Sequence, residues 1–216
     1  IEELSHARPK YGFLVEERGE IKGENESDRF IIDPLDGTTN FLHGIPHFAI
    51  SIAHERNREL EAGVIFDPIK DEMYWAVKGG GAWMNDRRLR VSSRNKLDQA
   101  VLGTGVPHLG RGDHGEFLAI VEQMMSRVSG IRRFGAAALD LAYVASGRFD
   151  GFWELDLHPW DIAAGQLLVR EAGGYCTDYA GRDKAMQSGE VLAANDNLHP
   201  MLSRLIRELR RERASA

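Results

Sequence analysis

The chain has 216 residues, of which 43% are hydrophobic, and a formal net charge of −6. This size suffices for one compact domain or two closely packed halves with a sizeable core. The acidic balance argues against general nucleic-acid binding, because such binding needs a basic face that displaces counterions. No run of eighteen apolar residues and no signal peptide is visible, so we expect no membrane association. The single cysteine, Cys176, excludes an internal disulfide and favours a reducing cytoplasm.

The first elements expected along the chain are two short strands separated by a polar segment. Apolar residues at 13–15 and at 30–32 read as short buried strands. The polar residues 18–28 between them are expected to form a solvated loop, which could still carry an extra metal ligand towards a site. Pro34 is expected to end the second strand, because proline lacks the N–H group that a central strand donates.

Two carboxylates follow that second strand. Asp33 and Asp36 lie three residues apart, and Gly37 and Thr38 open a stretch in which a short helix could begin. Carboxylates at the edge of a buried sheet need a partner, and a divalent cation is the simplest one. A helix start beside them would favour an anion. The pattern therefore indicates a metal and phosphate site, although Asp-Pro and Asp-Gly are also common in ordinary turns.

The rest of the chain alternates strands and helices irregularly. Further strands are expected at residues 48–54, 60–66, 72–77, 82–84, 100–104, 131–134, 150–154, 175–178 and 191–194, and helices at residues 116–128, 136–146, 161–172 and 198–209. This pattern fits a layered α/β or α+β arrangement. Asp140, inside a helix, is expected to be structural or to face solvent. Arg210, Arg211 and Arg213 are expected to favour the negative end of a helix dipole and then to fray into solvent.

Rival catalytic chemistries have little support. No His-x-x-x-His pair lies on an evident helix and no Cys-x-x-Cys is present, so a zinc site is not expected. The glycines at 79–81 are not followed by the Lys-Ser or Lys-Thr of a phosphate-binding loop. His43, His47 and His158 are near the motifs and could touch a substrate, but such histidines are more often structural. Asp161 would begin a helix, where it could equally be a simple N-cap.

Three blocks of sequence together resemble a known family. They are Asp33-Pro-Leu-Asp36-Gly-Thr-Thr-Asn, then Trp160-Asp161-Ile-Ala-Ala-Gly165 followed by Glu171-Ala-Gly-Gly174, and the weaker Phe13-Leu-Val-Glu16-Glu17. Taken in their order along the chain, they resemble the signatures of the inositol monophosphatase family, whose members are magnesium-dependent, lithium-sensitive phosphatases of sugars and polyols. The resemblance extends from about Tyr11 to Asn195, with Val15 in place of the usual glycine.

The resemblance implies a fold of the inositol monophosphatase and fructose-1,6-bisphosphatase type. This is a layered α-β-α-β-α sandwich of class α/β (α+β). It implies one domain over residues 1–216, with a metal-site half at about 11–134 and a second half at about 135–216. In the family, two helices precede the Glu-Glu motif and carry an aspartate that helps to orient the attacking water. Nearly all of that segment is missing here, so we expect an N-terminally incomplete chain.

The resemblance also implies a set of metal ligands. Glu16, Asp33 and the backbone carbonyl of Leu35 would hold one Mg²⁺. Asp33, Asp36 and Asp161 would hold a second, and a third, weaker ion could bind near Glu16 and Glu17. Ligands that are all oxygen suit Mg²⁺, with Mn²⁺ as a substitute, whereas Ca²⁺ or Li⁺ should inhibit.

The catalytic residues implied by the family are Thr38, Glu16 and Asp33. Thr38 would exchange hydrogen bonds with the attacking water, and the N–H groups of Gly37 and Thr38 would bind phosphate oxygens at a helix start. The other substrate contacts implied by family position are Asp36, the backbone of Ala137, Glu154 and Asp161.

The implied activity is Mg²⁺-dependent hydrolysis of a phosphate monoester by activated water, without a covalent phosphoenzyme. Residues 135–154 look most similar to bacterial inositol monophosphatases, so myo-inositol monophosphate is the favoured substrate. Histidinol phosphate, fructose bisphosphate, NADP and phosphoadenosine nucleotides are alternatives. A cytoplasmic homodimer is also implied. A non-catalytic partner-binding protein on the same fold is a further alternative, although such a protein has no need of the full ligand set.

Overall fold

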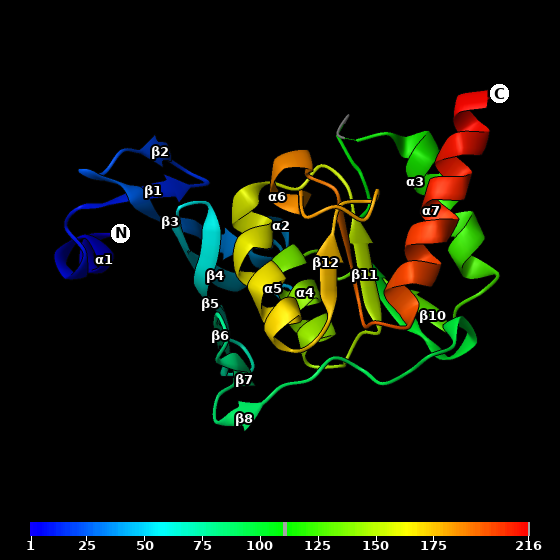
Figure 1. Cartoon of the computed structure of the whole chain (residues 1–216), viewed down its shortest axis with the longest axis horizontal. Coiled ribbons are helices and arrows are strands. Elements are labelled where there is room, and N and C mark those ends of the chain that lie inside the picture. Colours follow the sequence, from blue (N-terminus) through cyan, green and yellow to red (C-terminus); the bar gives the residue numbers. More distant parts are fainter. Residues whose placement is uncertain (110–111, 216) are drawn as a thin grey trace.

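The computed structural model describes residues 1–109 and 112–215, which are built around two β-sheets (Figure 1). The larger sheet has the strand order β2-β1-β3-β4-β5-β6-β7-β8 and contains β1 (Tyr11–Val15), β2 (Gly19–Ile21), β3 (Asn25–Asp36), β4 (Ala49–Arg56), β5 (Glu59–Asp67), β6 (Glu72–Val77), β7 (Gly81–Met84) and β8 (Arg87–Arg88). The smaller sheet has the order β10-β9-β11-β13-β12 and contains β9 (Val101–Thr104), β10 (Gly130–Arg132), β11 (Gly151–Glu154), β12 (Tyr175–Thr177) and β13 (Val191–Ala194).

Helices fill the space between the sheets and cover the outer face of the smaller sheet. The helices are α1 (Glu2–Ala7), α2 (Thr38–Leu42), α3 (His114–Met125), α4 (Ala137–Ala145), α5 (Pro159–Glu171), α6 (Ala185–Ser188) and α7 (Leu198–Ser215), with a 3₁₀ turn at Leu97–Gln99. The main core packs α4 and α5 between the two sheets. A second core joins the smaller sheet to α3 and α7. On the outer face of the larger sheet, Leu4 of α1 packs against Phe13, Val15 and Ile32. The layered α/β sandwich expected from the sequence is therefore confirmed.

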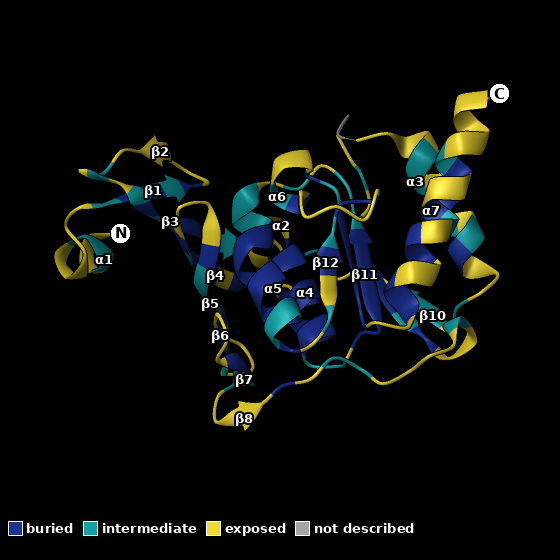
Figure 2. Ribbon diagram, in the orientation of Figure 1, coloured by how far each residue is buried: buried dark blue, intermediate teal, exposed yellow. Residues whose placement is uncertain are grey.

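The two central helices are held unusually close to their neighbours. Every residue of α4 is buried, and most of α5 is buried as well (Figure 2). A Cβ at Gly165 of α5 would lie 2.5 Å from Cβ of Leu141 in α4, and a Cβ at Gly63 of β5 would lie 3.0 Å from Cα of Ala164. Because packed interiors tolerate little added volume, these glycines let α5 lie tightly against both α4 and the larger sheet. The start of α5 is thereby fixed in position.

The expectation of a loop over residues 18–28 is wrong. This segment forms β2 and the first part of β3, and β2 pairs antiparallel with β1 at the edge of the larger sheet. Its polar character has a local explanation in the buried Asp28, which accepts hydrogen bonds from Asn25, Ser27 and Arg56. Burial favours the neutral acid, but these bonds hold the pKa of Asp28 well below its usual range. A polar strand is stable here because its buried charge is fully bonded.

Pro34 does not end the second strand, which is a further correction. β3 continues to Asp36, and its pairing with β4 shifts register between Asp33 and Asp36. A bulge of this kind accommodates a proline, which has no backbone N–H to donate to the hydrogen bonds between paired strands. Pro34 therefore lies in an irregularity of the strand rather than beyond its end, and the bulge changes the direction in which the following side chains point.

The second half of the chain also departs from expectation at particular residues. Helix α5 begins at Pro159, two residues before the predicted start. Asp140 is buried and its Oδ1 has no hydrogen-bond partner among the described residues, so it does not face solvent. Arg210 bonds Glu116 and Glu190, and Arg213 bonds Asp113. These two arginines therefore tie α7 to neighbouring segments instead of fraying into water.

Within the described residues, no helix combines the length and apolar character that crossing a bilayer requires.

Candidate active site

A cleft of about 270 Å³ opens where the end of β3 meets α2, α4, β11 and the start of α5. Every residue that the family resemblance assigned to catalysis, metal binding or substrate binding lines this cleft. They are Glu16, Asp33, Leu35, Asp36, Gly37, Thr38, Ala137, Glu154 and Asp161. Residues separated by up to 145 positions in the chain are thus brought together around one space.

The bulge in β3 presents two carboxylates to the cleft. Asp33 Oδ1 accepts a hydrogen bond from the backbone N–H of Leu35 at 2.8 Å, which stabilises the bulge. Asp36 Oδ2 accepts one from the N–H of Ala138 at 2.8 Å, so this carboxylate also bonds the first turn of α4. Each aspartate keeps its other oxygen for a further partner, and both side chains are buried.

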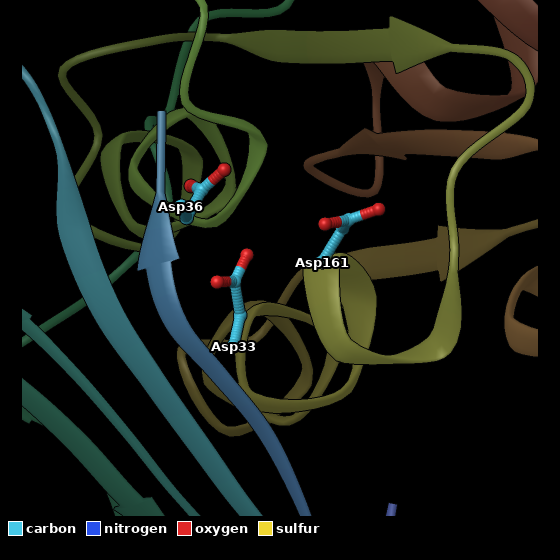
Figure 3. A group of neighbouring side chains, drawn as sticks. All are labelled: Asp33, Asp36 and Asp161. Atoms are coloured by element: carbon cyan, nitrogen blue, oxygen red, sulfur yellow. The ribbon is translucent and has the colours of Figure 1, made fainter. Parts of the chain in front are cut away.

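The third carboxylate comes from the first turn of α5. Asp161 accepts a hydrogen bond from the N–H of His158 at 2.8 Å and forms part of a capping box, so it is an N3 residue rather than the N-cap. Ser51 of β4 donates to the carbonyl of Trp160 at 3.3 Å, which ties this turn to the larger sheet. Carboxylate oxygens of Asp33, Asp36 and Asp161 lie within 4.8 Å of one another (Figure 3). Capping and metal binding can therefore coexist at Asp161.

The electrostatics of the cleft favour a cation. Burial, with smaller effects from Glu16 and Asp161, raises the pKa of Asp33 to about 8. Burial and the charges of Asp161 and Asp33 raise the pKa of Asp36 well above its usual value. Without a counter-charge Asp33 would therefore retain its proton at neutral pH, and ionisation of Asp36 would be disfavoured, because like charges in a poorly solvated space repel. A divalent cation would remove that repulsion, and three oxygen donors are a suitable set for a hard cation.

The turn after β3 places Thr38 beside the carboxylates. The Thr38 hydroxyl donates a hydrogen bond to the carbonyl of Leu35 at 2.9 Å, which leaves its oxygen free to accept one. Gly37 precedes α2 with φ of +87°, and a Cβ there would lie 3.1 Å from the carbonyl of His47. Glycine is needed here for both conformation and space. The first N–H groups of α2 lack carbonyls from a preceding turn, so they are available to an anion.

The opposite side of the cleft carries Glu154, at the end of β11. Burial and the charge of Asp161 raise the pKa of Glu154 to about 8, whereas Arg133 lowers it. The carboxylate lies against Gly105, since a Cβ at that glycine would overlap Glu154 Oε1. Ala137, the first residue of α4, lies in the same lining. A neutral, hydrogen-bonding carboxyl of this kind suits a hydroxylated ligand.

Several lining residues were not found from the sequence. Gly105, His108 and Arg133 all line the cleft, and they come from connections that carry no recognisable motif. Gly135 is a partial signal in the sequence, because a glycine just before a helix often marks a constrained turn. In the structure this glycine has a φ of +83°. Of the three histidines considered from the sequence, only His158 is in the lining; His43 and His47 are not.

Comparison with known proteins gives consistent matches over nearly the whole chain. A model of the inositol monophosphatase family matches residues 1–212. An inositol-1-monophosphatase of Rhizobium meliloti (strain 1021) is 58% identical over 205 residues, which are 95% of this chain and 77% of that protein. The Nus factor SuhB of Pseudomonas aeruginosa is 47% identical over 196 residues, covering 89% of this chain and 72% of that protein. A crystal structure of the extragenic suppressor protein suhB from Bartonella henselae has a TM-score of 0.92 and 56% identity, covering 95% and 79% of the two chains.

Proposed function

The chain belongs to the inositol monophosphatase family, and from this premise we propose that it hydrolyses phosphate monoesters with Mg²⁺, with myo-inositol monophosphate as the favoured substrate. The observation that carries the proposal is the convergence of Asp33, Asp36 and Asp161 in one cleft. In a non-catalytic protein that binds no cation, three clustered carboxylates would only repel one another and lower stability.

The donor set fits the proposed cofactor. Asp33, Asp36 and Asp161 would hold one Mg²⁺, and Glu16, Asp33 and the carbonyl of Leu35 would hold a second. When bound, Mg²⁺ neutralises phosphate charge and lowers the pKa of water. Glu16 is exposed and its charge raises the pKa of Asp33, so it lies on the solvent side of the site. A third ion could bind there.

The chain's own residues then bind and orient the ester. The N–H groups of Gly37 and Thr38 would donate to phosphate oxygens, because they open α2 beside the carboxylates. The Thr38 hydroxyl donates to Leu35 and would accept a hydrogen bond from the attacking water, which fixes that water's orientation. Glu154 and the backbone of Ala137 would contact hydroxyl groups of the leaving alcohol. Asp36 and Asp161 are close enough to reach one as well.

Phosphate release is the direct test of this function. With myo-inositol 1-phosphate we expect turnover that requires Mg²⁺, is partly supported by Mn²⁺, and is inhibited by Li⁺ or Ca²⁺. Histidinol phosphate, fructose 1,6-bisphosphate, NADP and 3′-phosphoadenosine nucleotides should be slower. A faster member of this panel would replace inositol phosphate as the substrate. Folded protein that binds Mg²⁺ but releases phosphate from no ester would contradict the catalytic proposal.

That last outcome would favour the non-catalytic alternative. The alternative has one specific observation in its support, namely that a relative with 47% identity carries the name Nus factor SuhB. The complete set of acids in the cleft counts against it, so we place it second.

We also propose that the protein forms a homodimer through a surface beside the cleft. Phe41 and Leu42 of α2 and the following Ile45 are 51%, 76% and 48% exposed, and contiguous exposed apolar residues are typical of interfaces. Light scattering should give twice the chain mass for the wild type, and Leu42→Glu should shift it towards the monomer. A monomeric wild type at micromolar concentration would contradict this proposal.

A further inference from the structure

A second cavity, of about 360 Å³, lies beside the second half of α5. Its walls come from the turn between β4 and β5, the residue after β6, α5, and the segment that leads into and forms α6. Helix α5 packs against β5 and α6 in this region (Figure 1). The volume is within the range of about 300 to 1,000 Å³ that small-molecule sites occupy. Among the described residues, none lines both this cavity and the active-site cleft, so the two spaces are separate.

The lining of this cavity contains a buried acceptor without a partner. Gln166 of α5 is only 2% exposed, and its Nε2 donates to Asp183 Oδ1 at 3.2 Å. Because a carboxylate only accepts hydrogen bonds, the amide nitrogen must be the atom that faces Asp183. The other amide atom, Gln166 Oε1, is buried and accepts no hydrogen bond from the described residues. An unpartnered buried acceptor is costly, and a ligand in the cavity that Gln166 lines can supply the missing donor.

The same lining contains one unpaired cation. The other charged side chains are bonded within the protein: Lys78 to Glu59, Arg170 to Asp183, and Glu171 to the backbone N–H groups of Gly79 and Gly81. Arg58 is exposed, and it forms no hydrogen bond or ion pair with any residue in the described ranges, 1–109 and 112–215. A guanidinium offers paired donors that match a carboxylate. A singly charged carboxylate suits this place better than a phosphate dianion, because Glu59 is adjacent and would repel the dianion more strongly.

The turn holds Arg58 in a conformation that arginine disfavours. Asn57 and Arg58 form the two-residue connection between β4 and β5, with φ of +51° and +66°. Such turns typically carry asparagine followed by glycine, because a residue with a Cβ rarely adopts a positive φ. Asn57 follows this pattern and Arg58 does not. The arginine therefore does not serve the turn, and its side chain bonds nothing in the described part of the chain, whereas ligand binding would give it a role.

We propose that this cavity binds a small α-amino or α-hydroxy acid with an apolar side chain. Arg58 binds the carboxylate, and the ammonium or hydroxyl group of the ligand donates to Gln166 Oε1. Leu60, Leu167 and Met186 line the same cavity and bury the hydrocarbon part of the ligand. The site uses no residue of the active-site cleft, so it goes beyond the proposed phosphatase function and does not depend on it.

Four probe molecules with the same branched hydrocarbon test the two polar contacts. L-Leucine and L-2-hydroxy-4-methylpentanoate carry both a carboxylate and a donor, 4-methylpentanoate lacks the donor, and 3-methylbutylamine lacks the carboxylate. Calorimetry with the wild type in EDTA should show one site per chain for at least one of the first two. Removal of either polar group should weaken binding about 10- to 100-fold. EDTA prevents a carboxylate from binding through a metal ion in the active-site cleft.

Two substitutions assign the contacts. Arg58→Gly should weaken binding of the acid to the level of 3-methylbutylamine, and it should not lower the thermal stability, because glycine suits this turn. Gln166→Leu should weaken binding of the acid to the level of 4-methylpentanoate. If Gln166→Leu fails to fold, Arg58→Gly alone decides. The matched control is Arg87→Gly, at an exposed residue of β8 that is absent from the cavity lining, and this variant should bind like the wild type.

The assignment would be overturned if neither acid bound the wild type at millimolar concentration. Binding that Arg58→Gly retains in full would also overturn it, since the ligand would then occupy another place. Binding of only the hydroxy acid would support the site and identify its donor as a hydroxyl group, and binding of only leucine would identify an ammonium group. No phosphate ester is present in these measurements. A wild type that binds the acid but hydrolyses no ester would therefore contradict the proposed function and leave this site in place.

Discussion

Asp33→Asn is expected to lower kcat/KM for phosphate release at least about 1000-fold, equivalent to about 4 kcal/mol of transition-state stabilisation. Asp33 is the one residue assigned to both proposed Mg²⁺ positions, and it is buried. Asparagine at this position keeps an oxygen that can accept the hydrogen bond from Leu35 N–H, so the bulge in β3 should persist. The change therefore removes the charge and leaves the backbone in place. Steady-state phosphate release with saturating Mg²⁺ gives the measurement.

Asp86→Asn is the matched control for this variant. Asp86 is exposed in the turn between β7 and β8 and lies outside the cleft lining, so the same chemical change there should leave kcat/KM within about twofold. Calorimetry should show that Asp33→Asn binds Mg²⁺ more weakly than Asp86→Asn. If Asp33→Asn kept more than about a tenth of wild-type activity, Asp33 could not be a ligand shared by both ions.

The sequence predicted the composition of this site better than it predicted the strands beneath it. Asp33, Asp36 and Asp161 are close in space because two short motifs specify a bulge and a helix start, and both features depend on local chemistry. The loop predicted at residues 18–28 failed for a different reason. Asp28 is compatible with a buried strand only because His54 and Arg56, on the neighbouring strand, bond its carboxylate. Such a partner is a property of the folded sheet and not of the segment itself.

The residues that sequence reasoning missed share a similar cause. Arg133 and His108 lie in connections, and their presence in the cleft depends on how two sheets and α4 pack together. No periodic pattern marks them, because connecting segments have no repeating face. Arg210 shows the same limit, since its pairing with Glu116 and Glu190 joins three distant segments. Local pattern predicts which groups could act, and packing decides which of them meet.

The stability of the metal-free protein is expected to fall as pH rises from about 6.5 to 8.5. Asp33 releases its proton near pH 3.8 in an unfolded chain and near pH 8 in the folded one. Between these values the folded state binds more protons, so the free energy of unfolding decreases with increasing pH. The pKa of Glu154 is raised to about 8, and those of Asp36 and Asp140 are also raised, so these groups act in the same direction. His47, whose pKa burial lowers from 6.5 to about 4, is neutral in the folded state but partly protonated in the unfolded chain near pH 6.5, so it opposes this trend at the lower end of the range.

Mg²⁺ should reduce the loss of stability between pH 6.5 and 8.5, because it binds the deprotonated carboxylates of the folded state. Urea unfolding at pH 6.5 and 8.5, with EDTA or with saturating Mg²⁺, measures both effects. The stabilisation by Mg²⁺ should be larger at pH 8.5. In EDTA, Asp33→Asn should lose less stability than the wild type between the two pH values, by at least about 1.4 kcal/mol, the equivalent of one pKa unit.

Asp140→Asn distinguishes the effect of removing a buried acid from the effect of removing a metal ligand. Asp140 is buried beside the cleft but does not line it, so its removal should raise stability at pH 8.5 both with and without Mg²⁺. Asp33→Asn should do so only without Mg²⁺, since its loss also removes a ligand. Equal stabilisation by Mg²⁺ at both pH values, or a metal-free wild type that gains stability towards pH 8.5, would show that these carboxyls are not protonated in the folded state. Solvent or other partners would then separate the charges of these acids, and the acids would not require a cation.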